Sequence, residues 1–447
     1  MSERVIALLD EGLGNQAYLV DLGDGRALAL DATVDLRTLD HEAATRGLRV
    51  VVAADTHLHA DFLSGSTRLA RRDGAVILGS ALGGRLFEHV PMADGQAYDL
   101  GGLTLVGWTT PGHTDEHMSY LLMDGDGVLA AFTGGSLIVG SAARTDLVSP
   151  GRTDELARAQ FRSLRRLAQL PDSTPVFPTH GAGSFCSAPP GADRITTIGR
   201  EKATNALMAL EDEDEFVARL LASLGTYPPY FRRLGAVNRD GVPDLDTGPL
   251  ARLGLRELRS LHASGAEIVD VRPSDQFAAG HVPGSLAIAL RPVLATWLGW
   301  MVPDDGTPLA FVRNGDQDPE EIVWQARKVG YGNLAGELDG GFATWADAGL
   351  PVGRTPLVDG HAVAGAVPLD IRQANEFASG HVPGAVNVEL GDVTAERAPA
   401  GSLVTMCGGS DRAMTAASVL EREGREVSVL EGGTGAWARA TGQELVT

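Results

Sequence analysis

One motif of this 447-residue sequence occurs twice, and the repeat limits what the second half of the chain can fold into. The motif runs from 270 to 284, and a matching motif runs from 370 to 384, one hundred residues later. Each copy is followed by a Gly-Gly-x-x-x-Trp element, which ends at Trp345 in the first copy and at Trp437 in the second. Units of this length are large enough to be domains, so the repeat predicts two similar domains in tandem.

Apolar runs and helix-favouring runs alternate within the two copies. We expect strands at 267–271 and 403–406 and a helix at 414–423. Alternating β and α elements at this spacing predict an α/β domain with a parallel sheet flanked by helices.

The two copies resemble rhodanese domains. Both carry Asp-(Val/Ile)-Arg, Phe-Ala-x-Gly-His-Val-Pro-Gly and Gly-Gly-x-x-x-Trp in the same order, over about residues 252–447. The resemblance implies the rhodanese α/β fold and a nucleophilic Cys in the loop after a central strand. We place the first rhodanese-like domain at 250–355 and the second at 358–447.

Only the second copy has a Cys at the position of that nucleophile. Cys407 follows the predicted strand and begins a six-residue loop that ends at Arg412, where a helix starts. Backbone N–H groups and the dipole at a helix N-terminus favour a thiolate and the anionic end of a persulfide. Arg412 adds donors for an anionic sulfur group, whereas the charge of Asp411 opposes the thiolate. We therefore predict Cys407 and Arg412 as catalytic residues of a sulfurtransferase.

The first copy has Arg313 at the equivalent position, directly after the predicted strand 309–312. An Arg side chain cannot carry a persulfide, so we expect this domain to be structural or to form a contact surface. We expect His281 and His381, which lie in the repeated motif, to brace its turn rather than to act in catalysis.

The first half of the sequence contains a cluster of metal-binding residue types. An apolar run at 48–54 predicts a buried strand, and His57, His59 and Asp61 follow it. Side chains two residues apart at a strand exit project to the same side, so these nitrogen and oxygen ligands share one focus. The pattern predicts a transition-metal site.

Two further predicted strands end near a His, at His113 after the run 103–108 and at His180 after 176–178. This order of motifs resembles the metallo-β-lactamase superfamily, specifically its persulfide dioxygenase branch, over roughly residues 1–240. The motifs are Thr56-His57-x-His59-Ala60-Asp61, Thr110-Pro111-Gly112-His113-Thr114, Phe132-Thr133-Gly134 and Arg144-Thr145-Asp146. The resemblance implies an αββα sandwich that oxidises glutathione persulfide, or another low-molecular-weight persulfide, to sulfite with Fe(II) and O₂.

One departure from the family pattern concerns the iron ligands. The resemblance implies a mononuclear iron held by two His and one Asp, which map to His57, His113 and position 135, but this chain has Gly135. His59 could complete a three-His site with the other two, and Asp61 could approach as a substitute ligand. If the site is weakened only by the missing carboxylate, Gly135→Asp is expected to give tight iron binding.

A second departure is Phe62, which stands where the family has another His. A second metal would then keep only Asp61 and His180, so a two-metal centre is not expected. The cofactor we predict is one Fe(II), with zinc as an alternative, or none if the site is degenerate. The alternative functions are a thioester hydrolase similar to glyoxalase II and a degenerate module with only sulfurtransferase or binding function.

Three residues outside the ligand set are candidate substrate contacts: Arg144, Thr145 and Tyr230. Arg144 could bind an anionic group of the substrate, or it could form a structural ion pair with Asp146. His117, four residues after His113, is expected to be an ordinary turn residue rather than a partner of the site. A helix is expected over most of 193–211.

Composition limits the surroundings and partners of the chain. No apolar run approaches the ~18 residues of a membrane helix, and the first residues lack a signal-peptide pattern. Two cysteines suit a reducing cytoplasm, and a net charge of −21 opposes nucleic acid and anionic membranes. The expected partner is a small-molecule persulfide or a glutathione-like thiol. The sequence leaves the oligomeric state open, with a homo-oligomer as one alternative.

Overall fold

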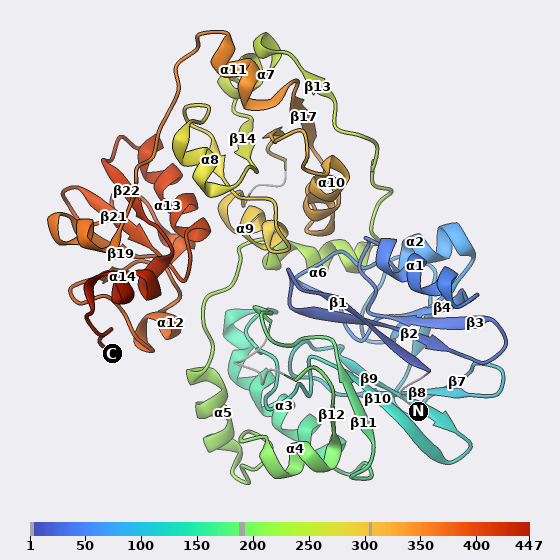
Figure 1. Cartoon of the computed structure of the whole chain (residues 1–447). Coiled ribbons are helices and arrows are strands. Elements are labelled where there is room, and N and C mark those ends of the chain that lie inside the picture. The colour runs from blue at the N-terminus through green and yellow to red at the C-terminus, as the bar shows by residue number, and fades with distance from the viewer. Residues whose placement is uncertain (1–3, 187–192, 304–305) are drawn as a thin grey trace. The chain divides into compact units, whose positions relative to one another are not determined.

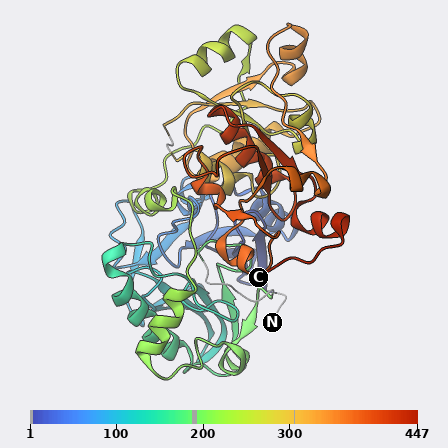
Figure 2. The same cartoon turned by 90° about the vertical axis from the view of Figure 1, so that its left-hand side faces the viewer.

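The computed structural model describes residues 4–186, 193–303 and 306–447 (Figure 1; Figure 2). They form two compact units. Unit 1 comprises Met1–Leu245 with Arg327–Gly330, and unit 2 comprises Asp246–Ala326 with Tyr331–Thr447. Within the described ranges, no helix has the length and apolar character needed to cross a membrane.

Unit 1 contains two six-stranded sheets. The first has the order β1-β2-β3-β4-β5-β6 and consists of β1 (Val5–Asp10), β2 (Asn15–Asp21), β3 (Arg26–Leu30), β4 (Arg49–Ala54), β5 (Val76–Ser80) and β6 (Val90–Met92). The second has the order β12-β11-β10-β9-β8-β7 and consists of β7 (Ala97–Asp99), β8 (Thr104–Thr109), β9 (Met118–Asp124), β10 (Gly127–Gly134), β11 (Pro175–Pro178) and β12 (Thr196–Thr197).

Alternating side chains place these sheets face to face between helices. On β9, Tyr120 and Leu122 belong to the apolar cluster between the sheets, whereas Leu121 belongs to the cluster beneath the helices of the second sheet. On β2, Leu19 likewise packs with the helices of the first sheet. These outer helices are α1 (Arg37–Thr45) and α2 (Ser66–Asp73) on the first sheet, and α3 (Thr153–Leu167), α4 (Ile198–Thr204) and α5 (Glu213–Ala222) on the second (Figure 1). The predicted αββα sandwich is confirmed.

The helix predicted over most of 193–211 is wrong. That stretch holds only β12 and the short helix α4. The Asn205 side chain accepts hydrogen bonds from the backbone N–H groups of Leu207 and Met208, at 3.0 and 3.1 Å. An Asn that bonds its own downstream backbone offers the chain an alternative to the helix, so α4 ends there. A helix absent from the predictions, α6 (Phe231–Asp240), follows later, and a 3₁₀ turn, η1 (Pro150–Arg152), precedes α3.

Unit 2 contains two five-stranded parallel sheets with the same topology, β13-β17-β16-β14-β15 and β18-β22-β21-β19-β20. The first repeat domain consists of β13 (Arg252–Leu253), α7 (Leu255–Ala263), β14 (Glu267–Asp270), α8 (Ser274–Ala279), β15 (Leu286–Ala287), α9 (Leu294–Met301), β16 (Leu309–Val312), α10 (Pro319–Lys328), β17 (Leu334–Leu338) and α11 (Gly341–Asp347). The second consists of β18 (Leu357–Val358), η2 (Gly360–Gly365), β19 (Val367–Asp370), α12 (Ala374–Ala378), β20 (Val386–Asn387), η3 (Leu390–Asp392), β21 (Leu403–Met406), α13 (Asp411–Arg422), β22 (Val427–Leu430) and α14 (Gly433–Thr441). The predicted parallel α/β class is confirmed.

The repeated motif forms the same set of stabilising contacts in both domains. In the first copy Arg272 donates to both carboxylate oxygens of Asp270 and to the carbonyl of Gly280, at 2.8 Å for the carbonyl. His281 stacks on Phe277 with ring centroids 3.8 Å apart. The second copy repeats the ion pair, the carbonyl contact and the stacking with Asp370, Arg372, Gly380, Phe377 and His381. Both histidines therefore brace the turn, as predicted.

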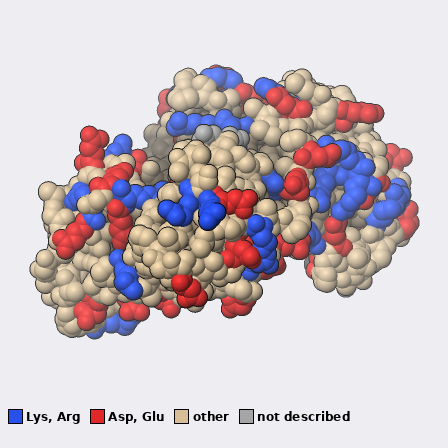
Figure 3. All heavy atoms as spheres, turned by 90° about the horizontal axis from the view of Figure 1, so that it is seen from above, with Lys and Arg blue, Asp and Glu red and all other residues tan. Residues whose placement is uncertain are grey.

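The acidic charge of the chain is mixed with basic side chains at the surface. Over the face shown in Figure 3, Asp and Glu lie among Lys and Arg. The net charge of −21 still repels anionic polymers at long range.

Candidate metal centre and sulfur-transfer loop

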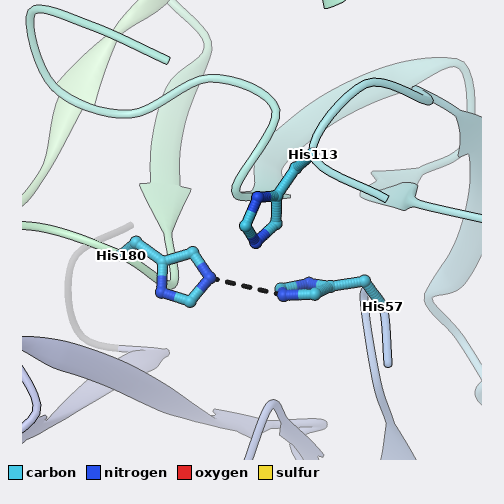
Figure 4. A group of neighbouring side chains, drawn as sticks. All are labelled: His57, His113 and His180. Atoms are coloured by element: carbon cyan, nitrogen blue, oxygen red, sulfur yellow. Dashed lines mark hydrogen bonds between the residues drawn. The ribbon is translucent and has the colours of Figure 1, made fainter. Parts of the chain in front are cut away.

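Three strands of unit 1 end beside one buried cluster of imidazoles. His57 lies shortly after β4, His113 follows β8, and His180 follows β11. Their rings point toward one another (Figure 4). Nε2 of His57 and Nε2 of His180 are 3.3 Å apart, and one nitrogen of each of the three rings lies within 4.8 Å of the others. Each residue is at most 1% exposed, so the cluster is shielded from bulk water.

The outer nitrogen of each ring contacts an acceptor, which fixes the tautomer. The three contacts are His57 Nδ1 to Thr56 Oγ1 at 2.9 Å, His113 Nδ1 to the Arg144 carbonyl at 2.7 Å, and His180 Nδ1 to Asn15 Oδ1 at 2.9 Å. Thr56 Oγ1 and Asn15 Nδ2 donate their own protons to carboxylates, so the Thr56 hydroxyl and the Asn15 carbonyl accept from the rings. Neutral rings held in this way turn three Nε2 lone pairs inward, which is the arrangement that binds a metal cation.

Burial keeps these rings neutral. It lowers the pKa of His57 well below its usual value and lowers the pKa values of His113 and His180 to about 3. His113 Nε2 has no hydrogen-bond partner among the described residues. A buried imidazole nitrogen without a partner, facing two others, fits a metal ligand, because only a neutral imidazole can bind a metal.

His59 and Asp61 form a neighbouring group that shares His180. His59 Nε2 contacts Asp31 Oδ1 at 3.1 Å, and Asp61 Oδ2 accepts from Asn15 at 2.5 Å. Burial alone would lower the pKa of His59, but the Asp31 carboxylate outweighs burial and raises it. His59 is therefore engaged by a charged partner, and His180 takes the place beside His57 and His113 that the sequence offered to His59.

The sulfur-transfer loop lies in the second repeat domain, after β21. Cys407 is 2% exposed, and its Sγ accepts a hydrogen bond from the backbone N–H of Gly409 at 3.4 Å. Gly433 passes so close that an added Cβ would lie 2.3 Å from the Cys407 carbonyl oxygen, and its φ of +70° also favours glycine. The backbone N–H of Thr434 donates to the same carbonyl at 3.1 Å. The loop is thus packed tightly between β21 and the start of α14.

Comparison with known proteins gives similarities for the two kinds of fold. Residues 255–348 and 357–440 match the model of the Rhodanese-like domain. The structure of a metallo-β-lactamase from Staphylococcus aureus superposes with a TM-score of 0.66 at 24% identity, covering 74% of this chain and 98% of that one. This chain joins a metallo-β-lactamase fold to two rhodanese-like domains.

Two further proteins match part of this chain. The human hydroxyacylglutathione hydrolase-like protein is 31% identical over 185 residues, which cover 40% of this chain and 59% of that protein. ETHE1 from Myxococcus xanthus is 30% identical over 53% of this chain and 97% of that one, with a TM-score of 0.46. The chain spans 57% to 66% of the length of the first curated relatives that it matches.

The metallo-β-lactamase part buries a histidine that the sequence predictions assigned to an ordinary turn. His117 is 0% exposed, stacks on His57 with centroids 5.2 Å apart, and accepts the Gly135 N–H at Nε2 over 3.0 Å. The prediction was wrong because the Thr110 hydroxyl, 2.9 Å from Nδ1, satisfies the other nitrogen of His117 and allows its burial. The His113-x-x-x-His117 spacing was the available signal.

The hydrogen-bond donors of the Arg144 guanidinium are all used within the protein. Its guanidinium pairs with Asp146 at 2.7 and 2.8 Å and is 3% exposed. The remaining donors go to the carbonyls of Phe185, Gly225 and Thr226. All five N–H groups are used, so the ion-pair alternative holds and no donor remains for a substrate anion. Its carbonyl instead orients His113.

The other two candidate substrate contacts also make bonds within the protein. Tyr230 is 1% exposed, and its hydroxyl donates to the Asp61 carbonyl at 3.1 Å. Thr145 is buried and donates to the Thr153 carbonyl at 3.4 Å. Tyr230 therefore supports the loop that carries His59 and Asp61 rather than facing solvent.

Arg412 is an ion-pair partner in this structure. Its two terminal nitrogens donate to the two carboxylate oxygens of Glu376 at 2.7 and 2.8 Å. The predicted anion-binding role therefore requires Arg412 to leave Glu376 or to act while paired. In the other rhodanese-like domain Arg313 makes a similar two-point pair with Glu337 and donates to the Gln317 carbonyl, which closes the loop that lacks a Cys.

Glu376→Gln is expected to increase kcat/KM for thiosulfate by about two- to tenfold, because it releases the Arg412 charge for an anionic donor. The measurement is thiocyanate formation from thiosulfate and cyanide. Glu396→Gln removes the same charge from an exposed position of the same domain and serves as the control. Equal rates for the two variants and the wild type would show that Arg412 does not bind the donor.

Gly135→Ala and Gly135→Asp are both expected to displace His113. A Cβ at Gly135 would lie 2.5 Å from Cδ2 of His113 and 3.0 Å from Cβ of Ala143. We expect each variant to lose about 1–3 kcal/mol of unfolding free energy and part of its metal content. Gly151→Ala, where an added Cβ meets nothing within 4 Å, is the control. If Gly135→Asp binds iron more tightly than the wild type, the ring moves aside readily and the missing carboxylate is the limiting defect.

Proposed function

We propose that this protein is a sulfane-sulfur enzyme with two activities. In unit 1, one metal ion held by His57, His113 and His180 supports oxidation of a low-molecular-weight persulfide, such as glutathione persulfide, to sulfite. In unit 2, Cys407 transfers sulfane sulfur. The observation that carries the proposal is the convergence of three buried, neutral imidazole nitrogens whose partner nitrogens are already bonded.

The ligand set suits an anionic substrate. Three neutral imidazoles leave the charge of a divalent cation uncompensated, and Gly135 contributes no carboxylate. A persulfide is more acidic than the thiol it derives from and carries its negative charge on the terminal sulfur. When bound, Fe(II) would supply the redox chemistry with O₂. The protein supplies the dry surroundings and the fixed ring tautomers.

The overall oxidation balances without another reductant. One persulfide, one O₂ and one water give one thiol, one sulfite and two protons. The thiol carrier is regenerated and only the outer sulfur is oxidised.

Sulfur transfer uses the other site. The Cys407 thiolate attacks the outer sulfur of a persulfide, the S–S bond breaks, and the carrier leaves as a thiolate that takes up a proton. The Gly409 N–H, 3.4 Å from Sγ, stabilises negative charge on the sulfur. A second thiol then accepts the sulfur from Cys407.

A thioester hydrolase is the second candidate for unit 1. The observation that favours it is the three-His set, because three His ligands with an open position are also the set of hydrolytic zinc sites. The name of the human relative, a hydroxyacylglutathione hydrolase-like protein, agrees with this candidate. Phe62 counts against a two-metal form of this hydrolase. It stands where the family resemblance would put another metal ligand, and its ring packs on His59 with centroids 4.1 Å apart.

O₂ uptake with glutathione persulfide tests the first candidate, and cleavage of a glutathione thioester tests the second. Both are measured on the full chain purified without O₂, after its iron and zinc content has been determined. Persulfide-dependent O₂ uptake with sulfite formation supports the dioxygenase. Thioester cleavage alone would replace it with the hydrolase, and neither activity in a metal-loaded protein would reject both.

A further inference from the structure

The rhodanese-like domain without a Cys contacts the active loop of the other domain at Asp411. Ser274, the first residue of α8, donates its hydroxyl proton to Asp411 Oδ1 at 2.5 Å. Arg291, which lies shortly before α9, places Nε 3.1 Å from Asp411 Oδ2. Both carboxylate oxygens of this loop residue are therefore held by the other domain. We call these two contacts the Asp411 tether.

The tether lies at a pocket that both domains build. The pocket has a volume of about 350 Å³. Ser274, Leu290 and Gln317 of the first domain line it, and so do Ser410 and Asp411 of the Cys407 loop. A molecule in this pocket would touch the loop that carries the nucleophile.

The two rhodanese-like domains also contact each other along α13 by hydrogen bonds and apolar packing. The tether is therefore part of a larger contact. The hydroxyl of Thr415 donates to the carbonyl of Ala287 on the edge strand β15 at 2.6 Å. The N–H of Ala287 donates to the hydroxyl of Ser418 at 3.1 Å. Phe277 of α8 shares an apolar cluster with Leu420 of α13. The helix that begins at Asp411 is thereby docked on the first domain over three turns.

The charges around Cys407 explain why the tether matters. Arg412 forms its ion pair with Glu376, so this pair is internally balanced. Asp370 is balanced by Arg372 in the same way. Asp275 and Glu431 also line the pocket, and Asp411 is balanced by Arg291. Without Arg291, an extra uncompensated carboxylate in the loop would oppose both the thiolate and an incoming anionic persulfide.

We propose that Arg291 and Ser274 are positioning residues through which the rhodanese-like domain without a Cys supports sulfur transfer at Cys407 in the other. They hold the Asp411 side chain and offset its charge. The inference rests on the proposed role of Cys407 as the nucleophile. It gives the first rhodanese-like domain a function although its own loop carries Arg313.

The test is the rate at which iodoacetamide alkylates Cys407, followed by mass spectrometry of its peptide over a range of pH. In Arg291→Gln the alkylation at neutral pH is expected to be about three- to tenfold slower, with its pH profile moved to higher pH. Ser274→Ala should show a smaller shift in the same direction. Asp411→Asn in the Arg291→Gln background should return the profile to that of Asp411→Asn alone, because no charge remains to be offset.

The matched control is Arg422→Gln. Arg422 is also on α13 and also pairs across the domains, with Glu267, but it lies at the far end of the helix from Cys407. An unchanged Arg291→Gln profile would overturn the proposal, and so would equal shifts in Arg422→Gln and Arg291→Gln, which would indicate general loosening. Cyanide-labile sulfur is measured on the wild type in parallel. The absence of this sulfur would reject sulfur transfer at Cys407. The alkylation profiles would still show whether the Asp411 tether acts on the Cys407 thiol.

Discussion

His180→Ala is expected to lower metal affinity by about a thousandfold, whereas His59→Ala should lower it by only about ten- to a hundredfold. His180 Nε2 faces His57 Nε2 at 3.3 Å, so its loss removes a ligand. His59 is bound to Asp31 at 3.1 Å, so its loss removes a neighbour of the site. The binding free energy of about 10–16 kcal/mol of a four-ligand structural zinc site is roughly 2.5–4 kcal/mol per ligand, and the upper end of that range corresponds to about a thousandfold.

Titration of the metal-free variants with Zn(II), and anaerobically with Fe(II), measures these affinities directly. His41→Ala, an exposed histidine on α1, controls for loss of a surface imidazole. A His59→Ala variant as weak as His180→Ala would contradict the ligand set and support the alternative of His57, His59 and His113. Retention of full affinity in His180→Ala would remove His180 from the centre altogether.

Much of this arrangement follows from local patterns in the sequence. The apolar runs before His57, His113 and His180 predict buried strands, and β4, β8 and β11 lie there. A β run followed directly by His is a short-range signal, because burial of the strand and the position of its exit are encoded within a few residues. The repeated motif is similarly local, since Arg272 bonds Asp270 two residues away.

The sequence leaves the role of a side chain open where its partner lies far along the chain. Arg144 donates to the carbonyls of residues 185, 225 and 226, and Arg412 pairs with Glu376. A guanidinium predicted to bind an anion has the same local sequence as one already paired, so only the folded structure separates the two. The sequence also leaves open whether His59 or His180 lies beside His57 and His113. The reason is again a distant partner, because His59 contacts Asp31, 28 residues before it.

Cys407→Ser is expected to abolish the cyanide-labile sulfur that the protein carries after incubation with a persulfide. The chain has two cysteines, and Cys186 is the other. Burial raises the pKa of the Cys186 thiol well above its usual value, so this residue stays a thiol and attacks nothing. Cys407 instead has a backbone N–H at 3.4 Å from its sulfur and lies at the end of a central strand. The loss should be complete within the detection limit, since no other sulfur nucleophile exists.

Cys186→Ala is the matched control and should keep the full amount of labile sulfur, about one per chain. Cys186 has Asp61 as a neighbour, which raises the pKa of the thiol and lies beside the metal centre. The metal content of Cys186→Ala therefore reports on unit 1, whereas its labile sulfur reports on unit 2. Labile sulfur that persists in Cys407→Ser but disappears in Cys186→Ala would place the carrier in unit 1. The rhodanese-like domain would then serve as a scaffold, and persulfide bound beside the imidazole cluster would be the only sulfur chemistry of the chain.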